Sequence, residues 1–285
     1  MGSKLFELFG NYKNFSKKQK AIYDYTIKNA YGISMMNAAQ LSSAINVGEA
    51  TLFRFLKQIG YETYSDFKAD VHAYALEEMN SNYWQLRTTL ESNKEYRQNG
   101  PETIIRRSIS LLEKTISANM LHSVSRAVEL MLDAPKIGIL GLRLSKGAAL
   151  YFEYLLLPFL PKITQLSHDE SFIYDRLQHF NKDSVVFFIT GWPFSKNTAK
   201  AARYCAESGH KIILLTNNAA SPLAPLANVV ITVLKPADYY TSIPFIAVLE
   251  AITVEIALRL SPGSQEQLKE LDSILVKYNI IDKNA

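Results

Sequence analysis

The pattern of apolar and polar residues divides the chain into a helical N-terminal part and a C-terminal part in which short apolar runs alternate with amphipathic stretches. Two helix starts in the N-terminal part have the form of a capping box, with a glutamine three residues after Ser16 and after Asn37. The spacing of apolar residues predicts helices over residues 17–29, 38–45 and 49–59, the last ending at Gly60.

The second and third of these helices are separated only by a short turn around Gly48, which is typical of a helix-turn-helix motif. One face of the third helix is apolar, and we expect it to pack into a core: it carries Leu52, Phe55, Leu56 and Ile59. The helix would then enter the major groove of DNA, where arginine pairs with guanine and glutamine with adenine. The residues predicted to contact bases or their surroundings are Glu49, Ala50, Thr51, Phe53, Arg54, Lys57 and Gln58.

Lysines near the first helix are candidates for contacts with DNA phosphates. They are Lys13, Lys17, Lys18, Lys20 and Lys28. An alternative stays open for the whole N-terminal part, because an ordinary helical bundle with a solvated basic face fits the same spacing.

The C-terminal part begins with a long helical pattern over residues 104–132 and continues with short apolar runs that predict strands. The predicted strands cover residues 136–140, 163–166, 184–190, 211–216 and 229–233. The predicted helices between or after them cover residues 145–157, 170–180, 197–207 and 245–260. Alternating strands and helices indicate a five-stranded parallel sheet covered on both faces, a three-layer α/β/α domain. The expected organisation is therefore an all-α domain over residues 1–80, a helical linker over 81–110 and an α/β domain over 111–285.

Ligands of open α/β sheets bind beyond the carboxyl ends of the strands, so the loops after the predicted strands are the candidate site. The loop from Gly141 to Ser145 leads into a helix whose N-terminal amides suit an anion. The loop from Thr190 to Ser195 also leads into a helix and carries a hydroxyl at each end. These features suit a phosphate ester. An alternative needs no ligand: both serines are also good helix N-caps, and Gly141 would serve only a tight turn.

Composition excludes a wholly disordered chain and a protein held together by internal disulfides. The chain has 285 residues, 48% of them hydrophobic and 20% charged, which is enough apolar material for two folded domains. The net charge of +4 is shared between both parts, because residues 1–80 hold nine basic and eight acidic residues, so bulk charge does not decide whether the chain binds DNA. A single cysteine, Cys205, excludes an internal disulfide and fits a reducing compartment. We expect a cytoplasmic protein without a membrane span, metal or cofactor.

The motifs in both parts resemble the RpiR family of bacterial transcriptional regulators, which join a helix-turn-helix domain to a sugar isomerase (SIS) domain. The segment from Val47 to Phe55 looks like the family's recognition-helix signature, and Gly141-x-Arg143-x-Ser145 is similar to SIS domains. The segments 206–216, 221–224 and 227–228 are also similar to SIS domains.

This resemblance implies a regulator of carbohydrate metabolism that binds a double-stranded DNA operator as a dimer or tetramer and responds to a phosphorylated sugar. The residues expected at the sugar-phosphate site are Gly141, Arg143, Ser145, Thr190, Trp192 and Ser195. One loop departs from the family's Ser-x-Ser-Gly-x-Thr pattern. Trp192 replaces a small hydroxyl residue there, and Pro193 lacks both a backbone donor and the freedom of glycine.

Two other functions stay open. The first is a SIS-fold isomerase or lyase, which would need a general base such as Glu250, Glu255 or His168, although we expect no catalytic residue. The second is a regulator that has lost control by sugar phosphates, which the change at Trp192 and Pro193 favours. The apolar helix over 245–260 would either pack into the core or cover an interface between copies of the chain.

Overall fold

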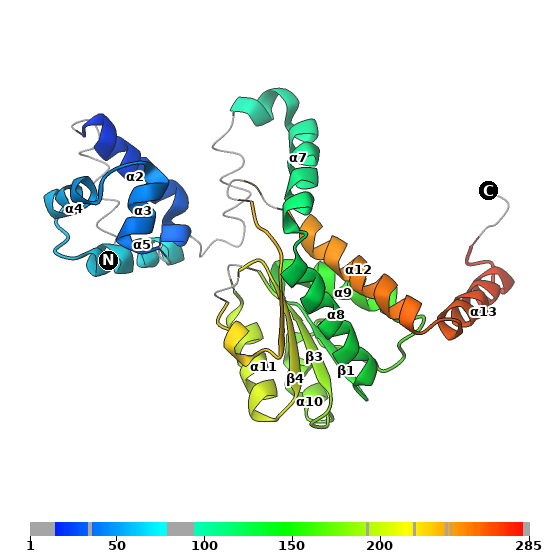
Figure 1. Cartoon of the computed structure of the whole chain (residues 1–285). Helices are drawn as coiled ribbons and strands as arrows, with labels where there is room; N and C mark the ends of the chain where they lie inside the picture. The colour runs from blue at the N-terminus through cyan, green and yellow to red at the C-terminus, as the bar shows by residue number, and fades with distance from the viewer. Residues whose placement is uncertain are drawn as a thin grey trace. The chain divides into compact units, whose positions relative to one another are not determined.

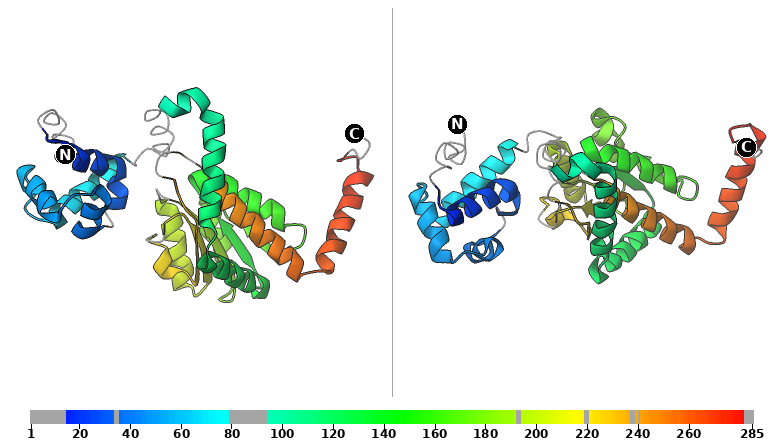
Figure 2. Two further views of the ribbon diagram at one scale, coloured as in Figure 1. Left: turned by 45° about the horizontal axis from the view of Figure 1, so that its top comes forward. Right: turned by 90° about the horizontal axis from the view of Figure 1, so that it is seen from above.

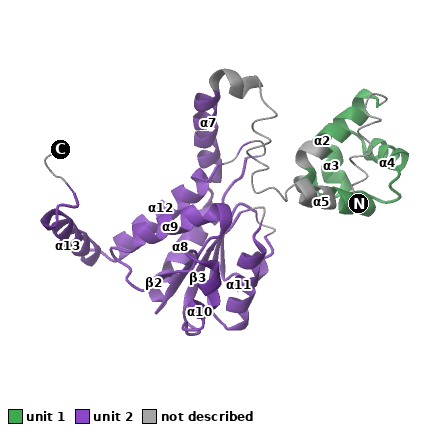
Figure 3. Cartoon of the chain, turned by 180° about the vertical axis from the view of Figure 1, so that it is seen from behind, with its two compact units in different colours: residues 1–87 green, residues 88–285 purple. Residues whose placement is uncertain are grey.

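The computed structural model of the chain describes residues 15–33, 36–78, 94–191, 194–218, 221–236, 239 and 241–281. Its contacts divide the chain into two compact units, residues 1–87 and residues 88–285, which Figure 3 colours separately. The predicted linker over residues 81–110 spans this division.

The first unit is helical (Figure 1). Its helices are α2 (Lys17–Ile33), α3 (Ala38–Ile45), α4 (Glu49–Gln58) and α5 (Tyr64–Glu78). Local sequence signals explain where the helices begin. Both halves of the capping box at Asn37 and Gln40 are present, and Asn46 ends α3 in the left-handed conformation, with φ of 57°. The core of this unit holds fully buried side chains from all four helices, among them Ile22, Leu41, Leu52 and Phe67.

The second unit contains a five-stranded parallel sheet with the order β2-β1-β3-β4-β5. The strands are β1 (Ile137–Leu140), β2 (Ile163–Gln165), β3 (Val185–Ile189), β4 (Lys211–Thr216) and β5 (Val229–Thr232). Helices α8 (Ala118–Asp133), α9 (Lys146–Leu156) and α12 (Ile243–Arg259) contribute to the core on one face. The short helix α10 (Ile173–Leu177) and α11 (Lys196–Glu207) cover the other face (Figure 1). The predicted three-layer α/β/α fold is confirmed.

The alternation of side chains in β3 explains why this sheet is buried on both sides. Val185, Phe187 and Ile189 belong to the core under α8, α9 and α12, whereas Val186 and Phe188 belong to the core under α10 and α11. A central parallel strand therefore reads as a continuous apolar run rather than as an alternating one.

The long helical pattern predicted over residues 104–132 is interrupted once in the structure. The structure has two helices there, α7 (Lys94–Thr115) and α8, because the Ser117 hydroxyl accepts a hydrogen bond from the Met120 amide and starts a new helix. Figure 2 shows α7 rising from the layer of helices beside α12.

The helix over 245–260 packs mainly into the core, as one of the two alternatives stated, because Phe245, Leu249, Ile252 and Ile256 are buried. The sequence patterns did not predict α13 (Gly263–Lys277), which follows α12 and stands clear of the sheet in both views of Figure 2. No helix within the described part of the chain has the length and apolar character that crossing a membrane requires.

Candidate functional site

The candidate nucleic-acid interface is the outer face of α4. Leu52, Phe55 and Leu56 bury the inner face of this helix. The N-cap, Gly48, is extended and provides no side-chain cap. Its carbonyl accepts hydrogen bonds from the amides of Thr51 and Leu52, so the turn that follows α3 passes directly into α4. This is the helix-turn-helix arrangement that the sequence predicts.

The outer face of α4 presents the mixture of groups expected for contact with base edges. Arg54 and Lys57 are exposed, and Phe53 exposes 39% of its surface. Ala50 and Glu49 are exposed as well, while Thr51 is half-buried. The Arg54 Nε donates to the Ala50 carbonyl over 3.2 Å, which leaves the terminal nitrogens of the guanidinium as the groups able to reach a base.

Gln58 has a structural contact that sequence reasoning missed. Its side-chain oxygen accepts a hydrogen bond from Gln19 Nε2 over 2.6 Å, and Gln19 Oε1 in turn accepts from the Ser16 amide. The C-terminal end of α4 is therefore joined to the capping box of α2. A bidentate contact of Gln58 with adenine needs both its oxygen and its nitrogen, so the contact with Gln19 would have to break first.

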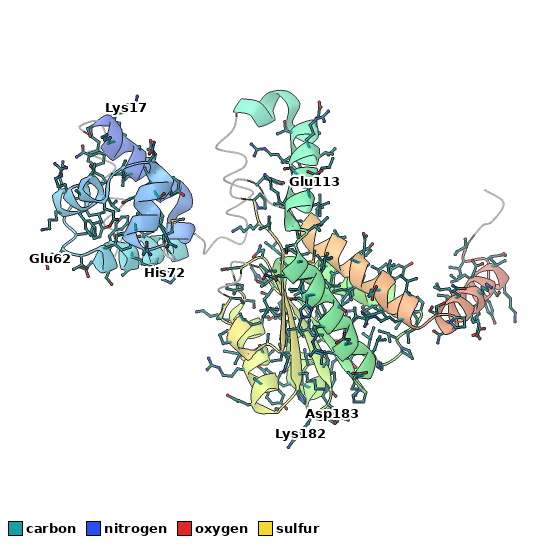
Figure 4. The ribbon with its side chains drawn as sticks, viewed as in Figure 1. Lys17, Glu62, His72, Glu113, Lys182 and Asp183 are labelled. Carbon is teal, nitrogen blue, oxygen red and sulfur yellow. The ribbon has the colours of Figure 1, made fainter. Side chains whose placement is uncertain are left out.

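That contact also places the start of α2 beside the end of α4. Lys17 and Lys18 are exposed in the first turn of α2, and Figure 4 labels Lys17 at the edge of the first unit. These two lysines are thus near α4, as contacts with DNA phosphates on its flank require. Lys13 lies outside the described residues.

The candidate ligand site lies at the end of the sheet where the carboxyl ends of the parallel strands meet, which we call the carboxyl edge. Lys182 and Asp183, which precede β3, mark the opposite edge (Figure 4). The register pairs Leu140 of β1 with Phe188 of β3, so the loops that begin at Gly141 and Thr190 leave adjacent strands at nearly the same level. The two predicted loops therefore lie together.

In the first loop, position 141 has room only for glycine. A Cβ at this position would lie 2.6 Å from the Ser145 carbonyl oxygen, and the Gly141 amide donates to Ser167 Oγ over 2.9 Å. Its N–H is therefore not available to a ligand. Arg143 is exposed in the left-handed conformation, with φ of 59°.

The two serines differ in their capping roles. Ser145 occupies the N-cap position of α9, but its side chain makes no capping hydrogen bond, so the capping alternative is wrong there. Ser195 does cap α11, because its Oγ accepts from the Thr198 amide over 3.4 Å. Of the two hydroxyls, only that of Ser145 is therefore left without a capping role.

The second loop begins with Thr190, which is buried and whose amide donates to the Leu215 carbonyl. A Cβ on the next residue, Gly191, would lie 2.9 Å from Asn217 Nδ2, so Asn217 after β4 faces this loop. Trp192 and Pro193 lie outside the described residues.

A polar network behind the first loop was missed by sequence reasoning. The Ser167 amide donates to Gln165 Oε1, and Gln165 Nε2 donates to the Ala149 carbonyl and to Glu153 Oε2, at 3.0, 3.1 and 3.2 Å. Both Ser167 and Gln165 are buried. Glutamine at the end of an apolar run was the available signal, because a buried amide needs partners. The network fixes the Gly141 loop against the end of β2.

Lys235 is a second group that sequence reasoning missed at this edge. It follows β5, and burial lowers its pKa from 10.5 to about 8.

The groups considered for catalysis are dispersed. The Glu250 carboxylate accepts from the Tyr151 hydroxyl at 2.7 Å, and Glu255 pairs with Arg259 at 2.8 Å on the same helix. Of the bases considered, His168 lies at the carboxyl edge, 3.8 Å from Glu153. Burial raises the pKa of Cys205 to about 12, which fits an apolar role inside α11.

Where side chains are described, no group of three His, Cys, Asp or Glu residues is placed to hold a metal ion. A shallow hollow between α10 and α11 is lined by Tyr174, Ala199, Lys200, Arg203, Tyr204 and Glu207, and none of the predicted ligand residues lines it.

Comparison with known protein families matches both parts of the chain. Residues 5–78 match the helix-turn-helix domain of the rpiR family, and residues 130–258 match the SIS domain. A relative from Clostridium perfringens, named as an uncharacterised HTH-type transcriptional regulator, is 22% identical over 91% of this chain and 94% of its own length. The HTH-type transcriptional regulator HexR of Pseudomonas aeruginosa is 23% identical over 94% of this chain and 95% of its own length.

Solved structures share the fold. The NanR protein of Vibrio vulnificus, complexed with ManNAc-6P, has a TM-score of 0.61 at 19% identity, over 96% of this chain and 98% of NanR. The sugar isomerase domain of an RpiR transcription factor from Sphaerobacter thermophilus has a TM-score of 0.58 at 22% identity, over 62% of this chain and 99% of that domain. The fold of the second unit is therefore shared with a sugar isomerase domain, and NanR is similar in fold over nearly the whole chain.

Proposed function

Because the chain belongs to the RpiR family, with the family's helix-turn-helix domain followed by a SIS domain, we propose that it binds operator DNA through α4 and that a phosphorylated sugar at the carboxyl edge of the sheet changes its affinity for that DNA. The observation that carries the proposal is the outer face of α4. It presents Arg54 and Lys57 to solvent on a helix whose other face is anchored in the core.

The proposed effector site rests on the two loops at the carboxyl edge. The Ser145 hydroxyl is free of a capping role, the α9 N-terminus provides a partial positive charge, and Arg143 supplies a guanidinium in the same loop. NanR, which shares the fold, was solved with a phosphorylated amino sugar, which supports a ligand of this class. The effector would change DNA binding only by as much as it distinguishes two conformations of the protein.

The chain is proposed to act on DNA as a homo-oligomer. A two-fold symmetric dimer presents two copies of α4 to a pseudo-palindromic operator, which is how helix-turn-helix proteins gain affinity from two half-sites.

Fluorescence anisotropy with labelled duplexes from the DNA upstream of the gene tests the DNA part. Arg54→Ala should weaken specific binding by about 1–3 kcal/mol and relax the preference at one base pair, because it removes a base contact. The matched variant Lys17→Ala should weaken binding to all duplexes alike and lower the salt dependence, because it removes a phosphate contact. Unchanged operator preference in Arg54→Ala would refute the assignment of α4.

A thermal-shift panel of sugar phosphates, with the unphosphorylated sugars as controls, tests the effector part. A ligand at 100 times its dissociation constant should stabilise the protein by about 2.7 kcal/mol. Ser145→Ala should remove this shift, whereas Ser195→Ala should keep it because Ser195 acts as a cap. No shift across the panel would favour a regulator that has lost sugar-phosphate control. Turnover of a sugar phosphate by the purified protein would favour an isomerase or lyase.

A further inference from the structure

Helix α7 carries an exposed apolar stripe that its own domain does not cover within the described part of the chain. Ile105, Ile109 and Ile116 expose 62%, 53% and 64% of their surfaces, and Leu112 is half-buried among them. Ile116 continues the last turn of the helix, since its amide donates to the Leu112 carbonyl. At 100° per residue these four side chains lie within about 60° of one another. We call them the α7 stripe.

A neighbouring face of α7, about 80° around the helix from the α7 stripe, already has a role. Ser108 and Thr115 are buried, and α7 packs on α12. The α7 stripe is therefore a second apolar face, on a helix that is held in place by the first. Isolated apolar residues on a surface need no explanation, but a continuous row on one helix marks an interaction site.

The spacing of the α7 stripe is that of a coiled-coil seam. Its members follow one another at intervals of four, three and four residues, the alternation that places side chains at the a and d positions of a heptad. Such a row of isoleucine and leucine is complementary to another copy of itself, so a second copy of this chain is the natural partner.

The charges beside the α7 stripe fix the direction of pairing. Arg106 and Glu113 are exposed and flank it on one side, and Figure 4 labels Glu113 on α7. Arg106 Nε also pairs with Glu102 Oε1 on its own helix at 2.7 Å, so its terminal nitrogens are the groups that would meet a second copy. In an antiparallel pair, Ile109 meets Leu112 of the second copy, and Arg106 lies opposite its Glu113, twice by symmetry. A parallel pair would instead set Glu102 against its own copy, because Glu102 occupies an a position.

We propose that the α7 stripe is part of a two-fold interface between copies of this chain, with the two α7 helices antiparallel. This goes beyond the proposed function, because neither DNA binding nor a sugar phosphate specifies which surface joins the copies. Four side chains from each copy are fewer than the 20–30 residues that a stable interface takes from each partner, so other surfaces of the domain contribute as well.

Sedimentation velocity of the full chain over a concentration series tests the proposal. The wild type should form a dimer, and Ile109→Glu should raise the dimer dissociation constant at least about tenfold by burying a charge in the seam. The matched control is Lys114→Glu, an exposed change on the opposite side of α7 that should leave the dissociation constant unchanged. Circular dichroism of each variant checks that the fold is kept.

Charge reversal tests the direction of pairing. Arg106→Glu and Glu113→Arg should each weaken the dimer about threefold or more, and the double variant should restore it. The two positions are about 10 Å apart along one helix, so restoration reports contact between copies.

Cysteine cross-linking gives an independent readout, because the native Cys205 is buried and does not compete. The double variant with Ile105→Cys and Ile116→Cys should form an intermolecular disulfide, whereas Ile105→Cys alone should not, since its copies would lie about 16 Å apart. A monomeric wild type, an unchanged dimer in Ile109→Glu, or cross-linking by Ile105→Cys alone would each overturn the proposal. A monomeric wild type would also contradict the proposed homo-oligomer, whereas the results with Ile109→Glu and Ile105→Cys bear on the α7 stripe alone and leave the proposed DNA and sugar-phosphate binding untouched.

Discussion

Gly141 offers a sharp test of the ligand loop, because an added methyl group has no room there. A Cβ at this position would lie 2.6 Å from the Ser145 carbonyl oxygen and 3.0 Å from Ala149 Cβ. The closest atom belongs to the backbone, so the strain in Gly141→Ala cannot be relieved by turning a side chain. The loop itself has to move away from the position that the fold gives it.

The expected cost follows from two effects. Overpacking at a rigid position costs about 1–3 kcal/mol. Moving the loop also weakens the hydrogen bond from the Gly141 amide to Ser167 Oγ, which contributes about 0.5–1.5 kcal/mol. We expect Gly141→Ala to lower the free energy of unfolding of the second unit by about 2–4 kcal/mol, which corresponds to a fall in Tm of about 4–16 °C for a unit of this size.

Gly147→Ala, six residues further along the chain, is the matched control. Gly147 is exposed in the first turn of α9, and a Cβ there would meet nothing within 4 Å. Alanine favours the helix, so this variant should be neutral or more stable by up to about 1 kcal/mol. Differential scanning calorimetry of the full chain measures both variants. If Gly141→Ala melts at the same temperature as the wild type, the steric argument is wrong.

Three further predictions concern caps and charge. Asn37→Ala should destabilise the first unit by about 1 kcal/mol in urea unfolding because it removes the side-chain oxygen that accepts from the Gln40 amide, and an unchanged midpoint would contradict this. Ser195→Ala should cost about 0.5–1 kcal/mol by the same measurement, whereas Ser145→Ala should cost nothing measurable because its hydroxyl caps no helix; equal losses would be inconsistent with the two N-caps described. Burial lowers the pKa of Lys235 from 10.5 to about 8, so between about pH 8 and pH 10.5 the unfolded state binds more protons than the folded state. The free energy of unfolding should therefore rise with pH across this range. Lys235→Met should remove this rise, which unfolding at several pH values would verify or refute.

Local signals in the sequence were sufficient for several elements. Helix α3 was predicted at its observed bounds, because Asn37 and Gln40 satisfy the backbone donors at its start within one turn. Strand β4 was also predicted at its bounds, because a buried parallel strand between a turn and a loop is a continuous apolar run. The alternation of strands and helices then sufficed for the layered fold.

Other features depend on residues far apart in the sequence. The contact of Gln58 with Gln19 joins two helices 39 residues apart, so no pattern within α4 indicates it. The Gly141 amide donates to Ser167, 26 residues away, and Asn217 lies beside Gly191. Both contacts exist only because the sheet brings the ends of different strands together. Sequence reasoning therefore found the loops of the candidate site but not which of their groups are already used.

The sequence by itself determined the strands, the parallel sheet, the order of the two domains and most of the helices, α13 excepted, because these follow from propensity, capping and the period of apolar residues over short stretches. Tertiary structure alone decided which polar groups are satisfied and which apolar faces are covered. Ser145 and Ser195 look alike as sequence, and only packing shows that one caps a helix and the other does not. The isoleucines of α7 belong to a predicted helical pattern, and only the fold shows that one face of that helix is left exposed.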